Sequence, residues 1–165
     1  MDRAISCCIT GHRPEKLPWG ERENDPRCLA LKVRIRTELE RAYQRGIRHF
    51  LTGMARGTDL YFGEEVLALR KQHPDITLEA AVPFIGQADR WRREEKARYQ
   101  ALLNQCDYET VIRHSYDRSC MRQRNRYLVD HASLVLAVYN GKGGGTLYTM
   151  TYAMEQGAEV IILEV

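Results

Sequence analysis

Apolar residues along this chain gather into short runs that alternate with longer segments in which they recur every three or four positions. The short runs are rich in aliphatic and aromatic residues, and their length is typical of buried β-strands. We therefore predict six strands, over residues 4–10, 47–52, 77–82, 109–113, 134–139 and 159–163.

The segments between these strands carry the spacing of amphipathic helices. Helices are predicted over residues 27–45, from about residue 58, over 88–105, over 119–131 and from a glycine-rich loop to about Gly157. The face of the first helix that should be buried carries Leu31, Ile35, Leu39 and Ala42. The corresponding face of the last helix carries Leu147, Met150 and Met154.

Strands and helices that alternate in this way are typical of a parallel sheet with helices on both faces. The chain shows no linker, low-complexity tract or short-period repeat, and its 165 residues are enough to bury one substantial core. We therefore expect a single α/β domain over residues 1–165.

The composition is that of an ordinary globular protein, with 44% hydrophobic and 28% charged residues. A formal net charge of +3 is compatible with an anionic ligand but does not by itself indicate nucleic acid. The first strand is predicted so early that no signal peptide fits before it, and no apolar run approaches the roughly 20 residues of a membrane span. We expect a cytoplasmic protein without membrane contact.

The five cysteines have no spacing typical of a zinc site. Cys7 and Cys8 are neighbours in a predicted strand, where their side chains would point to opposite faces of the sheet. We interpret all five as reduced and mostly buried thiols, and we predict no metal site.

The segment 139–146, Tyr-Asn-Gly-Lys-Gly-Gly-Gly-Thr, lies between a predicted strand and a predicted helix. Its glycines let the backbone approach a ligand closely, and the helix that follows presents free N–H groups and a positive dipole end. Strand, glycine loop and helix together form an arrangement that binds phosphates, although the same loop would also serve as a flexible turn.

Unusual residues follow four of the predicted strands, and parallel strands place their carboxyl ends at one edge of the sheet, where ligands bind. We therefore predict a ligand site at that edge. Its candidate residues are Thr10, Gly11, His12, Arg13, Gly53, Met54, Ala55, Gly57, Thr58, Asp59, Pro83, Phe84, Asn140, Gly141, Gly143, Gly144, Gly145 and Thr146.

The side chains in these loops suggest roles. Arg13 suits a bidentate contact to phosphate. His12 is a candidate hydrogen-bond donor or general acid/base, or a loop histidine bonded to a carbonyl. Asp59 would bond a ribose hydroxyl or favour a helix dipole, while Thr58 and Thr146 are expected at N-cap positions, as caps or as ligand contacts.

The most basic stretch runs from residue 113 to residue 126 and includes Tyr116, with Tyr127 beside it. Arginines interleaved with tyrosines suit stacking on nucleic-acid bases, but they also fit a solvated helix face. Trp91 and Tyr99 lie two helical turns apart, which fits core packing or a subunit contact, so a homo-oligomer remains among the expectations.

Several of these blocks resemble the SLOG superfamily of Rossmann-like proteins, and within it the YpsA-like branch. The segment 10–14, Thr-Gly-His-Arg-Pro, matches the opening motif of that branch, and Pro83, Phe84, Gln87, Trp91 and Tyr99 match its middle. The segments 53–59 and 124–126 and the later Gly-Gly-Thr resemble the DNA-processing protein DprA. The resemblance covers nearly the whole chain.

The resemblance implies a Rossmann-like fold that binds a nucleotide or a nucleotide-derived ligand at the strand edge. It adds Arg124 and Asn125 to the candidate site and supports Gly11, Arg13, Gly53, Gly57, Asp59, Gly144, Gly145 and Thr146. No cofactor is indicated beyond such a ligand.

The related LOG enzymes cleave the N-glycosidic bond of nucleoside monophosphates and carry the signature Pro-Gly-Gly-x-Gly-Thr-x-x-Glu. Aligned on Gly145 and Thr146, this chain has Gly141 in place of the proline, Lys142 in place of the first glycine and Thr149 in place of the glutamate. The usual acid/base group of these hydrolases is therefore missing.

The sequence thus favours a sensory or regulatory binding module for a small nucleotide-like ligand. The first alternative is a nucleotide-processing hydrolase in which His12 or Asp59 is the acid/base group. The second is a single-stranded nucleic-acid binder that uses the arginine-rich segment.

Overall fold

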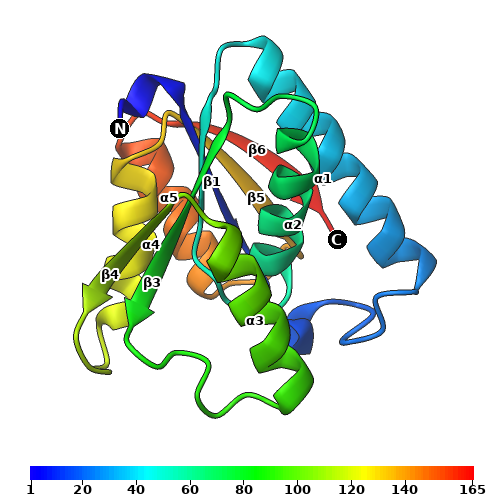
Figure 1. The fold of residues 1–165 in the computed structure, drawn as a ribbon, viewed down its shortest axis with the longest axis vertical. Coiled ribbons are helices and arrows are strands. Elements are labelled where there is room, and N and C mark those ends of the chain that lie inside the picture. The colour runs from blue at the N-terminus through cyan, green and yellow to red at the C-terminus, as the bar shows by residue number, and fades with distance from the viewer.

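The computed structural model describes residues 1–165 and contains one six-stranded sheet in which all neighbouring strands are parallel, in the order β4-β3-β2-β1-β5-β6 (Figure 1). The predicted parallel α/β fold is confirmed, and each predicted strand is present. The strands are β1 (Ser6–Gly11), β2 (His49–Thr52), β3 (Thr77–Phe84), β4 (Tyr108–Arg113), β5 (Leu134–Tyr139) and β6 (Glu159–Glu164).

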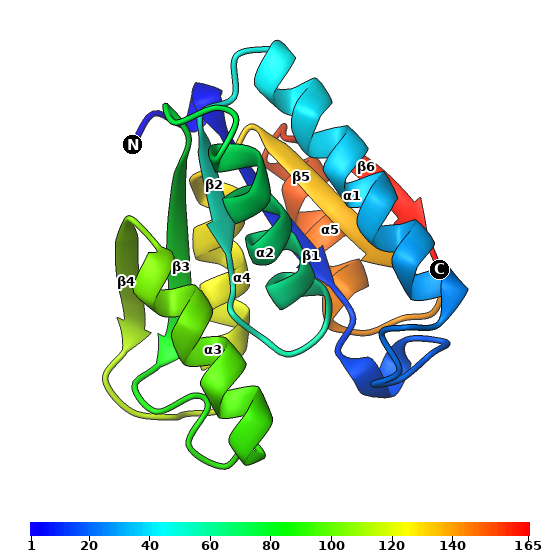
Figure 2. The same ribbon diagram turned by 45° about the vertical axis from the view of Figure 1, so that its right-hand side comes forward.

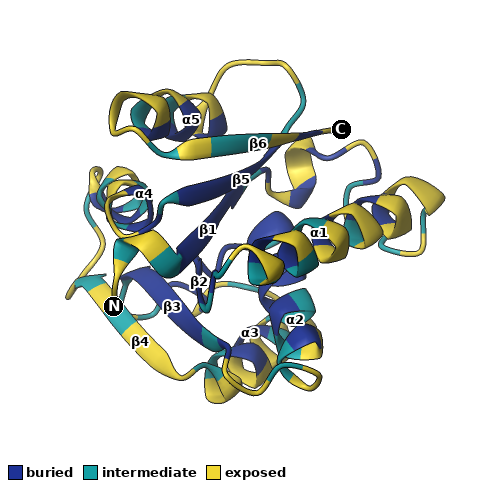
Figure 3. Cartoon of the chain, turned by 90° about the horizontal axis from the view of Figure 1, so that it is seen from above, coloured by how far each residue is buried: buried dark blue, intermediate teal, exposed yellow.

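Helices cover both faces of this sheet, with α1, α2 and α3 on one side and α4 and α5 on the other (Figure 3). The helices are α1 (Pro26–Gln44), α2 (Thr58–Arg70), α3 (Arg93–Gln105), α4 (Cys120–Asp130) and α5 (Gly145–Glu155), with two short 3₁₀ turns at Arg3–Ile5 and Pro14–Lys16. None of these helices is both long and apolar enough to cross a membrane.

The sheet separates two hydrophobic cores. Cys7 packs in the larger core under α1 and α2, whereas Cys8 packs in the smaller core under α4 and α5, as their alternation in β1 predicts. All five cysteines are free thiols, and four of them are buried. The predicted inner face of α1 is also confirmed, since Leu31, Ile35 and Leu39 are buried.

Two sequence predictions about helix faces and bounds are wrong. In α5 only Met150 of the three predicted residues is buried, whereas Leu147 is 40% exposed and Met154 is 57% exposed. Helix α5 packs against β5 and the edge strand β6, so only a narrow strip of its surface is buried. Leu147 and Met154 lie outside that strip.

Helix α3 begins at Arg93 rather than near residue 88, because a turn at Gly86 (φ = +83°) precedes it. Trp91 lies before this helix, with its ring edge-on to Tyr99 at 5.2 Å between centroids. Both rings contact the larger core, which confirms the packing interpretation of the pair.

The order of the strands decides where loops meet. From β1 the chain builds outward through β2, β3 and β4, and it then crosses to the other side of β1 to add β5 and β6 (Figure 2). Strand order therefore reverses between β1 and β5, and the carboxyl ends of these two strands form the crevice in which such sheets bind ligands.

Candidate functional site

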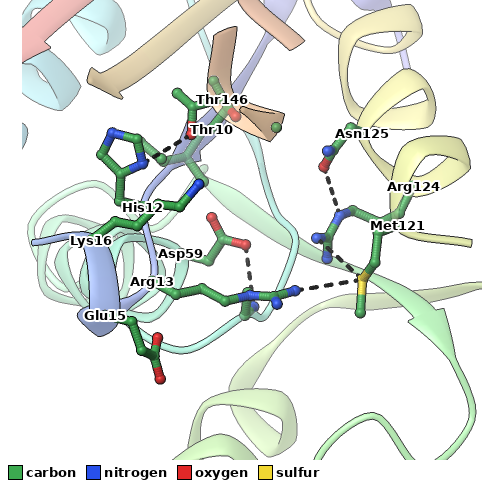
Figure 4. Close-up of a pocket in the computed structure, with 14 residues that line it drawn as sticks. Thr10, His12, Arg13, Glu15, Lys16, Asp59, Met121, Arg124, Asn125 and Thr146 are labelled. Carbon is green, nitrogen blue, oxygen red and sulfur yellow. Dashed lines mark hydrogen bonds between the residues drawn. The ribbon is translucent and has the colours of Figure 1, made fainter. Parts of the chain in front are cut away.

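A cleft of about 410 Å³ opens at the carboxyl ends of β1 and β5, bounded by α4 and by the N-termini of α2 and α5 (Figure 4). Most of the side chains that line it are polar or charged. The lining residues are Ile9, Thr10, Gly11, His12, Arg13, Glu15, Lys16, Ala55, Asp59, Met121, Arg124, Asn125, Gly145 and Thr146.

Helix α5 points its N-terminus into this cleft. The N–H groups of Gly145, Thr146 and Leu147 donate to no acceptor in the protein, and no side chain caps the helix. A Cβ atom at Gly145 would meet nothing within 4 Å, so the backbone here faces open space. Unused donors at the positive end of a helix dipole are suited to an anion.

His12 is buried and joins β1 to the glycine loop. Its Nε2 accepts a hydrogen bond from the N–H of Asn140 at 3.0 Å, and its Nδ1 lies 3.4 Å from Oγ1 of Thr146. Burial lowers the pKa of His12, and the nearby charge of Lys16 lowers it further. A neutral imidazole that accepts at Nε2 and donates at Nδ1 satisfies both contacts.

Asp59 and Arg124 lie at the floor of the cleft on either side of Gly53. Oδ2 of Asp59 accepts from the N–H of Ala55 at 3.2 Å, and Nη1 of Arg124 donates to the carbonyl of Gly53. Burial raises the pKa of Asp59, although the charge of Arg124 opposes that shift. Burial lowers the pKa of Arg124, and Asp59 opposes that shift in turn.

Two further cations stand at the mouth of the cleft. Arg13 and Lys16 are exposed and form no ion pair, whereas the carboxylate of Glu15 is paired with Arg56 outside the cleft. Positive charge therefore exceeds negative charge around the opening, which raises the local concentration of anions.

Two oxygens of mostly buried residues line the cleft without a protein partner. Thr10 is 6% exposed and its hydroxyl forms no hydrogen bond, and Oδ1 of Asp59, a residue that is 7% exposed, likewise has none. Both oxygens remain available to the hydrogen-bonding groups of a ligand in the cleft.

The glycine loop after β2 differs from the loop after β5. A Cβ at Gly53 would lie 2.7 Å from both Arg124 Nη1 and Asp59 Oδ2, and one at Gly57 (φ = +84°) would lie 2.8 Å from the carbonyl of His12. A Cβ at Gly11 would strike the Thr58 side chain at 2.4 Å. These three glycines let segments of the protein approach each other, whereas Gly145 leaves room for a ligand.

The prediction that Thr58 and Thr146 are N-caps is wrong. Glycines 57 and 144 occupy the two N-cap positions, and both threonines lie within the first turns of their helices. Thr58 is fully buried, and its N–H and Oγ1 both donate to the carbonyl of His12, at 3.2 and 2.9 Å. It fastens the start of α2 to the loop after β1.

The cleft brings together ten of the residues predicted from the sequence: Thr10, Gly11, His12, Arg13, Ala55, Asp59, Arg124, Asn125, Gly145 and Thr146. The remaining predicted residues do not line it: Gly53, Met54, Gly57, Thr58, Pro83, Phe84, Asn140, Gly141, Gly143 and Gly144. Met54 is wholly buried with φ = +61°, and Pro83 and Phe84 belong to β3, two strands away from β1.

Sequence reasoning missed four lining residues: Ile9, Glu15, Lys16 and Met121. The position of Lys16, only three residues beyond Arg13 in the first loop, was a signal that could have identified it. Met121 had no such signal, because only the packing of α4 brings its sulfur within 3.7 Å of Arg13 Nη2.

The arginine-rich segment is not one continuous basic surface. Arg124 is buried at 4% exposure, and Arg113 is paired with Asp117 at 2.7 Å. The hydroxyl of Tyr127 donates to Glu79 in the interior, so this ring is not free to stack on a base.

Thr149, which stands where LOG enzymes carry glutamate, is buried. Its Oγ1 donates to the carbonyl of Gly145 at 2.9 Å, within its own helix. The hydroxyl is therefore hydrogen-bonded within α5, and Thr149 does not line the cleft.

Among solved structures, DNA processing protein A (DprA) from Streptococcus pneumoniae has a similar fold. The two superpose with a TM-score of 0.57 at 14% sequence identity, over 95% of this chain and 49% of the DprA chain. The chain thus spans about half the length of DprA, and the similarity shows the fold alone.

Curated proteins from bacilli are similar in sequence. The UPF0398 protein RBAM_020340 of Bacillus velezensis is 28% identical over 92% of this chain and 84% of its own length. The uncharacterized SPbeta prophage-derived protein YoqJ of Bacillus subtilis is 31% identical over 78% of this chain and 83% of its own. The sequence profile of one family matches residues 7–161, nearly the whole chain, and the protein therefore belongs to the YspA SLOG family.

Proposed function

We propose that this protein is a cytoplasmic binding module for a nucleotide or nucleotide-derived ligand, with a sensory or regulatory role. The ligand's phosphate lies against the N-terminus of α5. The observation that carries the proposal is the set of unused N–H groups at the start of α5, where Gly145 and Thr146 line a cleft with an excess of cations.

The depth of the cleft supports an orientation for the ligand. Arg13 and Lys16 lie at the mouth with the end of α5, so the phosphate stays near solvent. The sugar enters below it, where the Thr10 hydroxyl and Oδ1 of Asp59 are without partners. Hydroxyl groups of a ribose form hydrogen bonds with both oxygens. His12 connects the loop after β1 to the glycine loop and the start of α5.

Isothermal titration calorimetry with a panel of nucleoside phosphates and nucleotide sugars tests the proposal. The Gly145→Asp variant should lose at least tenfold in affinity, because a carboxylate at the helix end repels the phosphate. The substitution fits sterically, since a Cβ at Gly145 meets no atom within 4 Å and the residue has no left-handed backbone conformation.

Thr151→Asp is the matched control, since it places the same charge on an exposed position of the same helix outside the cleft. It should bind as the wild type does. Absence of binding by the whole panel, or equal affinities in Gly145→Asp and the wild type, would overturn the proposed function.

Hydrolysis of the bound nucleotide is a second candidate, favoured by the buried Asp59 with its raised pKa and free Oδ1. Chromatography of the same mixtures would detect free base released by hydrolysis, which binding alone does not produce.

Binding of single-stranded nucleic acid is the third candidate. An oligonucleotide in the panel should then bind with an affinity that falls steeply as the salt concentration rises.

A further inference from the structure

A second groove continues from the cleft between the N-terminal halves of α4 and α5. It has a volume of about 670 Å³ and shares Met121, Asn125 and Gly145 with the cleft, so the two form one continuous depression. The groove is lined by Arg118, Ser119, Met121, Arg122, Asn125, Gly144, Gly145 and Tyr148.

The cleft has no phenyl, phenol or indole ring on which a nucleobase could stack, whereas the groove has one. The guanidinium of Arg122 lies over the ring of Tyr148, 4.5 Å from its centroid. Nε of Arg126 donates to the Tyr148 hydroxyl at 2.9 Å and fixes the ring in place. Tyr148 therefore provides a fixed aromatic ring for stacking, three residues beyond Gly145, where the phosphate is proposed to lie.

The acceptor groups that line this groove are already used within the protein. Oδ1 of Asn125 accepts from Nε of Arg124 at 3.0 Å, and because an arginine can only donate, the amide NH₂ must point the other way. The carbonyls of Gly144 and Gly145 accept from Tyr148 and Thr149.

Ser119 is likewise committed, since its hydroxyl donates to Asp117 and accepts from Gln123. No carboxylate lines the groove. The donors, in contrast, remain unused: Arg118 and Arg122 form no ion pair, and the NH₂ of Asn125 donates to no protein group. The groove therefore offers hydrogen-bond donors and almost no acceptors.

We propose that this groove is the base subsite of the ligand and that it selects purines with a 6-oxo group, such as guanine and hypoxanthine, over adenine. Arginine and amide donors pair with O6 and N7 of such a base. The 6-amino group of adenine would instead meet donors and lose its own hydrogen bond, which disfavours it. This inference rests on the proposed function and deepens it.

Inosine and adenosine 5′-monophosphates are matched probes, because they share sugar and phosphate and their bases differ in the 6-oxo and 6-amino groups. Titration calorimetry on the full chain should show inosine monophosphate binding at least about fivefold more tightly, the lower end of the discrimination expected for one bidentate base contact. Arg122→Gln should reduce that ratio to near one.

Arg90→Gln is the control for loss of charge, since Arg90 is exposed, unpaired and outside both depressions, and it should leave the ratio unchanged. Tyr148→Leu should weaken both nucleotides by a similar factor, because stacking does not distinguish them. Equal binding of the two nucleotides, or an Arg122→Gln variant that keeps the preference, would overturn the base subsite and leave the proposed function standing. Binding of neither would also overturn the base subsite, and the proposed function would then be decided by the rest of the panel.

Discussion

At the scale of single residues, the glycines of this chain serve two different purposes. Gly53 and Gly57 allow protein to pack against protein, while Gly145 leaves helix donors exposed to the cleft. The sequence places all of them in similar loops. What distinguishes them is the atom that a side chain would meet, and that atom comes from a distant part of the chain.

Gly53→Ala should therefore lower the free energy of unfolding by about 1–3 kcal/mol, because the methyl group overpacks the space between Arg124 and Asp59. Chemical denaturation measures this loss. Gly143→Ala is the control, since a Cβ there meets nothing within 4 Å, and its effect should stay within about 0.5 kcal/mol. Equal stability of the two variants would contradict this account of Gly53.

At the scale of elements, α4 is fixed to the sheet by a buried polar network. The carboxylate of Glu79 on β3 accepts from His49 Nε2 at 2.8 Å, from Thr110 Oγ1 at 2.9 Å and from the Tyr127 hydroxyl on α4. Helix α4 also carries Arg124, which lies at the floor of the cleft. The network therefore fixes the position of this side of the site relative to the sheet.

This network makes the free energy of unfolding depend on pH. Burial alone would raise the pKa of Glu79, but hydrogen bonds from His49, Tyr127 and Thr110 outweigh burial and lower it to about 2. A folded-state pKa below the unfolded value contributes stability above about pH 4.5, and that stability is lost as the pH falls toward 2. Each pKa unit corresponds to about 1.4 kcal/mol, so the contribution is about 3 kcal/mol.

Denaturation of the wild type and of Glu79→Gln between pH 6 and pH 2 measures this contribution. The wild type should lose about 3 kcal/mol more than Glu79→Gln over that range, because the amide does not titrate. Glu94→Gln, at an exposed glutamate without an ion pair, should follow the wild type. Parallel curves for the wild type and Glu79→Gln would show that the network does not hold an ionised Glu79.

At the scale of the whole molecule, the site lies at the centre of the sheet, where each strand is hydrogen-bonded to a neighbour on both sides. Strand β1 pairs with β2 and β5, and the cleft opens at its carboxyl end, so the site rests on the central strands. Strand β4 forms an edge, with Tyr108 and Val111 exposed at 50% and 39%. A rigid centre holds the binding groups in position without help from the edges.

Hydrogen exchange should reflect this difference. Amides of β1 and β5 should exchange slowest, at rates that report global unfolding, and those of β4 should exchange much faster through local opening. Mass spectrometry of the exchanged protein resolves the two regions. Protection of β4 equal to that of β1 would show instead that a second copy or another partner covers this edge.

The local sequence of this chain predicts its elements better than it predicts their burial. The helical and strand spacing located every α-helix and strand, because burial of one face imposes a period on the sequence. Residue burial at an edge is less regular, and the predicted inner face of α5 failed at Leu147 and Met154. The family resemblance identified Arg124, but its burial beside Asp59 depends on packing between α4 and the loop after β2.

Local periodicity and short motifs are enough to predict the alternation of strands and helices, the parallel sheet, the family and the polar loops at one edge. Which of these loops stays open depends on the packing of the folded chain. After β2 the N–H groups of Met54, Ala55 and Thr58 donate within the protein, to Thr52, Asp59 and His12, whereas those of Gly145, Thr146 and Leu147 at the start of α5 do not. The acceptor of the Thr58 N–H is the carbonyl of His12, which lies in a distant part of the sequence, and no local pattern of residues encodes such a contact.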